Sequence, residues 1–187
     1  MIFKVLLVLA EIVISYILQT SVFSHFRLAD VVPDVMMILT VSMAFISGKR
    51  AGALSGFVCG FIIDCTYGPL IGLFALMYST MGYLCGYSNR VYFQEDYTLP
   101  LFLVGGAEFV YNFIYYVFFY LLKGNLDLPH YMVRFMFPSV IYTVIVSIVI
   151  YRLLNFNHNL FTFIDDKREK NAKRTYEYKD FDMLRRH

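Results

Sequence analysis

The sequence predicts an all-α integral membrane protein with six transmembrane helices. The first observation is composition: the 187 residues are 59% hydrophobic and 16% charged, whereas a soluble domain carries about 25% charged residues. The second is charge segregation, because half of the sixteen Lys and Arg lie after residue 160. A span needs about 20 apolar residues, so a chain of this length holds about six spans with short connections.

Six apolar segments are expected along the chain. They cover residues 3–23, 33–47, 51–66, 70–88, 99–122 and 131–154. Together they form one transmembrane domain over residues 1–154, followed by a charged tail over 155–187. The third segment rises about 24 Å as a helix, less than the hydrocarbon thickness of about 30 Å. The third and fourth segments are therefore either two independent spans or a re-entrant hairpin.

The distribution of cations predicts the orientation. The side of the membrane with more Lys and Arg in short loops is usually cytoplasmic. A cytoplasmic N-terminus leaves only Arg27, Lys123 and Arg134 on the outer side, so both termini are expected in the cytoplasm. The first segment is too long for a cleavable signal and is expected to remain as a signal anchor. The tail has mixed charges, which fits a solvated helix or a docking segment for a cytoplasmic partner or anionic lipids.

The most regular pattern is a row of glycines spaced four residues apart. They are Gly48, Gly52, Gly56 and Gly60, with Asp64 one step further. Helical geometry places such residues along one ridge, and small residues four apart let membrane helices approach closely. We expect a packing seam within the protein or with a partner, joined by Gly72 of the next segment.

Polar residues in the first two segments need partners inside the membrane. Glu11, Ser15 and Gln19 share one helical face, which fits either hydrogen bonding between helices or a ligand site. Asp34 follows Pro33 at the start of the second segment. Proline suits the first helical position and an acid complements the helix dipole there, although a binding role stays open.

Charged residues in the later segments raise the question of ion pairing. Glu108 and Asn112 share a face of the fifth segment, and an acid at mid-membrane is a functional candidate. Arg134 has the opposite charge but is expected nearer the outer surface than Glu108. We therefore expect Arg134 to pair with Asp64, which lies at a similar depth.

No catalytic, cofactor or metal motif is present in the sequence. It contains no Ser-His-Asp set, no HExxH, no phosphate-binding loop and no CxxC. Cys59, Cys65 and Cys85 lie in apolar segments, and their odd number argues against a disulfide framework. The net charge of +2 does not indicate nucleic acid. We expect no enzymatic activity, no cofactor and no metal.

An ordered series of short motifs carries a resemblance to a known family. The series is Gln19-Thr20-Ser21, Pro33-Asp34, Gly52-Ala53-Leu54-Ser55-Gly56-Phe57, Gly60, Asp64, Gly72 and Ala75-Leu76. In this order and spacing it resembles the rod shape-determining membrane protein family MreD, over roughly residues 10–90. The length and the six apolar segments fit the same family.

The resemblance implies a scaffold or regulatory subunit of the cell-elongation machinery in the bacterial inner membrane. Such a subunit controls cell shape and sidewall peptidoglycan synthesis without catalysis. Its implied partners are membrane lipids, an MreC-like bitopic scaffold, the actin-like MreB, the polymerase RodA and its class B transpeptidase. The family is also similar in architecture to the six-helix substrate-binding subunits of energy-coupling-factor transporters. That similarity keeps a vitamin-type binding subunit open as the alternative, with Glu11, Gln19 and Glu108 lining a pocket.

Overall fold

The computed structural model describes most of the chain up to residue 155. The described residues are 2–27, 31–68, 71–91, 98–121 and 127–155, with the backbone alone at 2–5 and 89–91. The chain divides into a unit of Met1–Tyr151 and a unit of Arg152–His187. Of the second unit only residues 152–155 are described, so the expectations for the tail lie outside the described residues.

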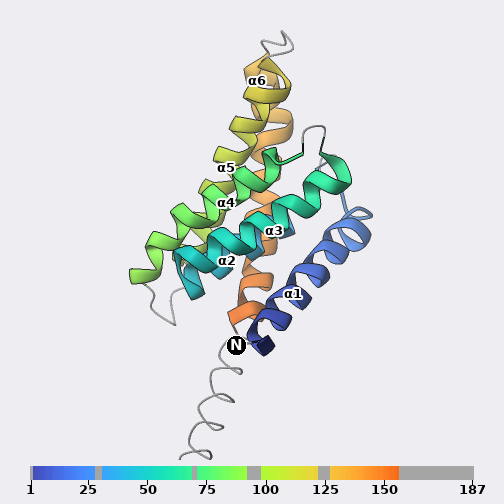
Figure 1. The fold of residues 1–187 in the computed structure, drawn as a ribbon. Coiled ribbons are helices and arrows are strands. Elements are labelled where there is room, and N and C mark those ends of the chain that lie inside the picture. The colour runs from blue at the N-terminus through green and yellow to red at the C-terminus, as the bar shows by residue number, and fades with distance from the viewer. Residues whose placement is uncertain (1, 28–30, 69–70, 92–97, 122–126, 156–187) are drawn as a thin grey trace, which may run out of the picture. The chain divides into compact units, whose positions relative to one another are not determined.

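Helices make up nearly all of the described chain (Figure 1). They are α1 (Ile2–Ile17) with the π-helical η1 (Leu18–Val22), α2 (Val35–Ser47), α3 (Lys49–Tyr67), α4 (Leu73–Cys85) with the 3-10 turns of η2 (Gly86–Val91), α5 (Thr98–Phe119) and a last helix (Leu128–Asn155). The last helix begins as α6 (Leu128–Tyr131) and passes through the π-helical η4 (Met132–Met136). The predicted all-α class is confirmed.

A proline explains the π-helical turn in the last helix. Pro138 has no N–H to donate, and in a regular α-helix its ring would meet the carbonyl four residues earlier. The wide turn ends just before it, where the N–H of Phe137 donates to the carbonyl of Met132. The last helix therefore continues past Pro138 and brings Ser139 to a buried position.

The centre of the first unit is α2. Every residue from Val35 to Ile46 is buried, as expected for a helix that is apolar on all sides. α1, α3, α4 and α5 all pack against it. Its two buried hydroxyls, of Thr40 and Ser42, donate to the carbonyls of Met36 and Ile38 at 2.9 and 2.6 Å, so neither is left unsatisfied.

The glycines of α3 form a close-packed seam inside the chain. Within the described residues, α3 and α4 share the largest interface. A Cβ atom added at Gly56 would lie 2.4 Å from the carbonyl oxygen of Tyr78, and one at Gly60 would lie 2.4 Å from that of Phe74. A Cβ added at Gly52 would lie 2.6 Å from the carbonyl oxygen of Gly82 on α4, and one added at Gly82 would lie 2.2 Å from the carbonyl oxygen of Gly52. Backbone meets backbone here, so there is no space for a side chain.

Gly48 and Gly72 do not belong to this seam, which corrects the sequence-based expectation. Gly48 has φ 87° between α2 and α3, and Gly72 has φ 99° immediately before α4. An added Cβ at Gly72 would find no described atom within 4 Å. Both positions favour glycine because side chains disfavour positive φ.

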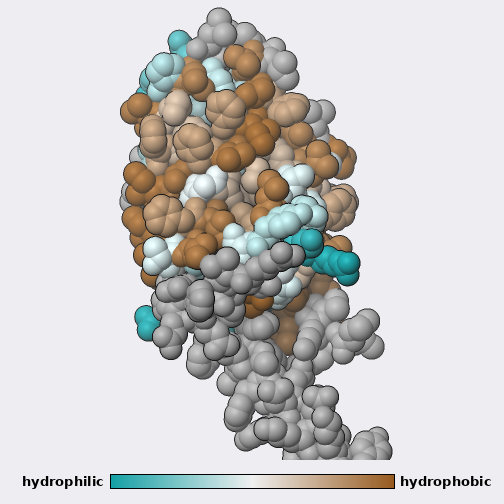
Figure 2. All heavy atoms as spheres, turned by 90° about the vertical axis from the view of Figure 1, so that its left-hand side faces the viewer, coloured by the Kyte–Doolittle hydropathy of each residue, from teal (hydrophilic) through white to brown (hydrophobic). Residues whose placement is uncertain are grey.

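Within the described part of the chain, two helices are long and apolar enough to cross a membrane, Thr98–Phe119 and Leu128–Asn155. The helices α2 and α4 have 13 residues each, and α3 contains Lys49, Arg50 and Asp64. Most of the coloured atoms on the face in Figure 2 are apolar. Large apolar side chains such as Phe102 and Val149 are at least 70% exposed, which is typical of helices surrounded by lipid. Six complete spans stay a prediction.

The seam predicts opposite effects for the same substitution at two glycines. Gly56→Ala should lower the free energy of unfolding by about 1–3 kcal/mol, because its Cβ overpacks against the backbone of α4. Gly106 of α5 has no described atom within 4 Å of an added Cβ, so Gly106→Ala should be neutral or stabilising by up to about 1 kcal/mol. Denaturant unfolding of both variants in the same detergent measures the difference. Equal stabilities would contradict the seam.

Candidate functional site

Two of the polar groups predicted in the first two segments, Gln19 and Asp34, meet at the start of α2. Asp34 is the N-cap of α2, and its Oδ1 accepts the N–H of Met37 at 2.9 Å. Gln19, from η1 after α1, accepts the N–H of Met36 through Oε1 at 3.0 Å. Both side chains satisfy N–H groups that a helix start leaves without partners. Gln19 thus joins two helices, whereas Glu11 is half-buried on α1.

Asp34 also connects α2 to two other helices. The hydroxyl of Tyr78 on α4 donates to Asp34 Oδ2, and the N–H of Asp34 donates to Thr143 Oγ1 of the last helix at 3.1 Å. Tyr78 is completely buried, and a buried tyrosine hydroxyl usually finds a partner. The sequence contained that signal, a tyrosine within an apolar helix, but did not show which acceptor it would reach.

Asp64 caps α4 instead of pairing with a cation. Its Oδ1 accepts the N–H of Phe74 at 3.0 Å and its Oδ2 accepts the N–H of Ala75 at 2.9 Å. The side chain is 2% exposed. Arg134 lies exposed on the last helix, so the predicted ion pair between Asp64 and Arg134 is wrong. The amides at the start of α4 supply the partial positive charge that Asp64 needs.

Glu108 lies at the contact between α5 and the last helix. It is 1% exposed, and its Oε1 accepts from Asn112 Nδ2 at 3.0 Å and from Ser139 Oγ at 2.7 Å. Asn112 Nδ2 also donates to the backbone carbonyl of Glu108 at 2.9 Å. Among the described residues, Glu108 Oε2 is a buried oxygen without a donor. A buried acceptor that lacks a donor is costly. The hydrogen bonds within the described residues therefore account for Oε1 of this carboxyl but not for Oε2.

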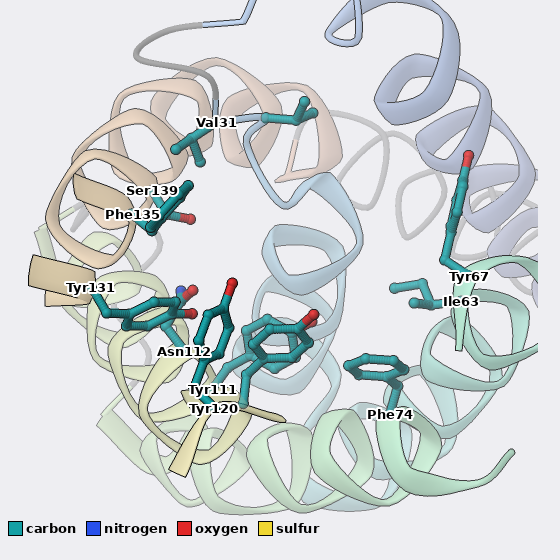
Figure 3. A pocket seen from close by; sticks show the side chains of 12 residues that line it. Val31, Ile63, Tyr67, Phe74, Tyr111, Asn112, Tyr120, Tyr131, Phe135 and Ser139 are labelled. Atoms are coloured by element: carbon teal, nitrogen blue, oxygen red, sulfur yellow. The ribbon is translucent and has the colours of Figure 1, made fainter. Parts of the chain in front are cut away.

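A cavity of about 380 Å³ adjoins these polar groups. Figure 3 shows rings from α5 and the last helix on one side and residues of α3 on the other. Its lining residues are Val31, Val32, Ile63, Tyr67, Phe74, Tyr111, Asn112, Tyr115, Tyr120, Tyr131, Phe135 and Ser139. They come from the ends of α3 and α5, the starts of α4 and the last helix, and the connection before α2. The cavity therefore lies at one end of the helices.

The sequence-based alternative placed a different set of residues around a pocket. Glu11, Gln19 and Glu108 are not among the lining residues of this cavity. Tyr115 was expected on the same helix face as Glu108 and Asn112, but neither it nor Tyr111, four residues earlier, was expected to line a cavity. Within the described residues, no group of three or more His, Cys, Asp or Glu could hold a metal ion.

The fold and its buried polar groups define a class, a helical membrane protein whose carboxylates connect helices. The chain matches the family model described as "rod shape-determining protein MreD" over residues 1–160 and belongs to that family. This is a family of inner-membrane proteins with a role in rod shape determination. No curated protein and no solved structure matches the chain. The similarity to substrate-binding subunits of energy-coupling-factor transporters stays a prediction.

The cap at α4 makes a prediction that distinguishes it from an ion pair. Asp64→Ala should lower the free energy of unfolding by about 1–3 kcal/mol, because two buried N–H groups lose their acceptor. Arg134→Met should leave it nearly unchanged, and the double variant should equal Asp64→Ala, since independent sites add. Unfolding of the three variants in detergent measures this. Recovery of stability in the double variant would contradict the cap and support an ion pair between Asp64 and Arg134.

Proposed function

We propose that this protein is a six-span membrane scaffold with both termini in the cytoplasm. The transmembrane domain covers residues 1–154 and the cytoplasmic tail residues 155–187. The two helices that are long and apolar enough to span support this proposal, as does the excess of cations on the side of the termini. The shorter α2 and α4 then lie among longer neighbours, where protein rather than lipid surrounds much of their surface.

The scaffold acts within the cell-elongation machinery and controls sidewall peptidoglycan synthesis together with an MreC-like bitopic partner. MreB, RodA and its class B transpeptidase belong to the same assembly. The observation that carries this proposal is the family match over residues 1–160, which includes every helix that the structure describes. A scaffold must hold its surface in a fixed geometry, and the tightly packed core of α2, α3 and α4 meets that requirement.

The buried polar groups support action through contacts rather than through catalysis. Asp34, Asp64 and Gln19 are each bonded to backbone N–H groups at helix starts. Groups used in this way hold helices in register, and the hydroxyl of Tyr78, which also bonds to Asp34, joins α4 to the same contact. We therefore assign them to the structure of the scaffold.

The proposed topology predicts which positions react from outside the cell. Asp127→Cys and Lys173→Cys are introduced singly into a background that lacks Cys59, Cys65 and Cys85. An impermeant maleimide added to intact spheroplasts should label position 127 and not position 173, because the two lie on opposite sides of the membrane. Both should react after lysis, which serves as the control. Labelling of position 173 alone in intact spheroplasts would contradict the topology.

The proposed partnership predicts what the protein captures. Tagged protein, expressed at its natural level and solubilised from native membranes, should bring down an MreC-like bitopic protein. An unrelated multi-span protein with the same tag and membrane level should not. Recovery of the other subunits of a vitamin transporter, without an MreC-like protein, would contradict the scaffold and favour the alternative function.

A further inference from the structure

The side chains that line the tyrosine-lined cavity disfavour a negatively charged ligand. Most of its lining side chains are aromatic, and the polar ones are tyrosine hydroxyls, Asn112 and Ser139. No Lys or Arg is among the lining residues that the structure describes. A phosphate or carboxylate would therefore lose its water without gaining a counter-charge, which is costly.

Two buried carboxyl groups, of Glu108 and Asp34, lie behind this lining. Asn112 and Ser139 both line the cavity and both donate to Glu108 Oε1, while Glu108 Oε2 has no donor among the described residues. Asp34, buried at the start of α2, is the second of these carboxyls. It connects to the lining through Tyr78, whose ring meets that of Tyr111 at 5.4 Å between centroids. A positive charge in the cavity would stabilise the ionised form of these carboxyls.

The rings themselves favour the same charge. Tyr111, Tyr115 and Tyr120 form a continuous series, with centroids 6.3 and 6.5 Å apart, and Tyr120 continues to Tyr131 at 4.9 Å. Aromatic faces attract cations, most strongly where water is excluded, and boxes of aromatic rings recognise ammonium groups. Tyr120, Tyr131 and Phe135 also line an adjoining cavity of about 240 Å³, which includes Asp127. This second cavity extends the site towards another acid, Asp127, and towards His130.

We propose that the tyrosine-lined cavity binds a protonated amine or alkylammonium group. Its volume of about 380 Å³ lies within the range of about 300–1,000 Å³ for small-molecule sites. In the proposed topology the cavity lies at the outer end of the helices, at the level of lipid headgroups. The amine comes either from a free small molecule or from an ethanolamine lipid headgroup.

Ethanolamine, ethylene glycol and glycolate form a matched set of cationic, neutral and anionic probes. Each is added to the full chain in nanodiscs of phosphatidylglycerol. The chain contains sixteen Tyr and no Trp, so its intrinsic emission reports on tyrosines, several of which line the cavity. Ethanolamine should change this emission saturably and raise the unfolding temperature, whereas the other two probes should do neither. Equal responses to ethanolamine and ethylene glycol, or no saturable response, would overturn the proposal.

Two variants with different chemistry test the assignment to this cavity. Glu108→Gln removes the charge and keeps the shape, and Tyr131→Leu removes a ring and keeps the carboxyl. Each should weaken ethanolamine binding by about tenfold. Tyr87→Phe, at an exposed tyrosine beyond α4, is the control and should bind like the wild type. If Glu108→Gln does not fold, Tyr131→Leu alone decides. Unchanged binding in every folded variant would overturn the assignment.

Native mass spectrometry distinguishes the two sources of the amine. The protein is released from nanodiscs that contain equal amounts of phosphatidylethanolamine and phosphatidylglycerol. Selective retention of phosphatidylethanolamine by the wild type, lost in Tyr131→Leu, supports the lipid headgroup. Ethanolamine binding without lipid selectivity supports a free amine. Absence of both would overturn the site.

Discussion

Contact between the glycine edge of α3 and the backbone of α4 is the constraint on which the rest of this structure depends. In lipid, helices gain no hydrophobic driving force from each other, so they associate through close van der Waals packing. Gly52, Gly56 and Gly60 remove the side chains that would hold the two backbones apart. Gly82 does the same on α4, and α2 fills the remaining side of this core with a helix that is buried throughout.

The position of α4 then determines the polar contacts of the site. Asp64 reaches the N–H groups of Phe74 and Ala75 because α4 begins beside the end of α3. One turn later, Tyr78 points to Asp34 at the start of α2. Phe74 and Tyr111, whose ring meets that of Tyr78, then form part of the cavity lining. A shift of α4 along the seam would break the cap, the tyrosine hydrogen bond and the cavity wall together.

The sequence predicted those features that depend on spacing along a single helix. The four-residue period of Gly52, Gly56 and Gly60 indicated a seam, and Pro33-Asp34 indicated a helix start. The sequence did not predict features that depend on the backbone conformation of the connections or on which distant segments meet. Gly48 and Gly72 have the same spacing as the seam glycines, but a positive φ cannot be read from spacing. Asp64 needed a partner, and opposite charge favoured Arg134, because a sequence does not show which backbone N–H groups come near.

The cavity illustrates the same limit at the level of tertiary structure. Its tyrosines come from α5 and the last helix, and their meeting point is set by how these helices pack on α2 and α4. The aromatic content of the sequence was evident, yet interfacial anchoring accounted for it equally well. Only the position of Glu108 behind Asn112 and Ser139 gives these rings a common electrostatic environment.

The contact between Gly52 and Gly82 tests the central claim most directly. The protein contains 11 glycines, so selective carbon-13 labelling of glycine gives a tractable solid-state NMR spectrum in lipid bilayers. The account predicts a cross-peak between Gly52 and Gly82 at short mixing times, because their backbones touch across the seam. Gly106, which has no described neighbour at its Cβ position, should give none with either. A folded protein without the Gly52–Gly82 cross-peak would contradict the account.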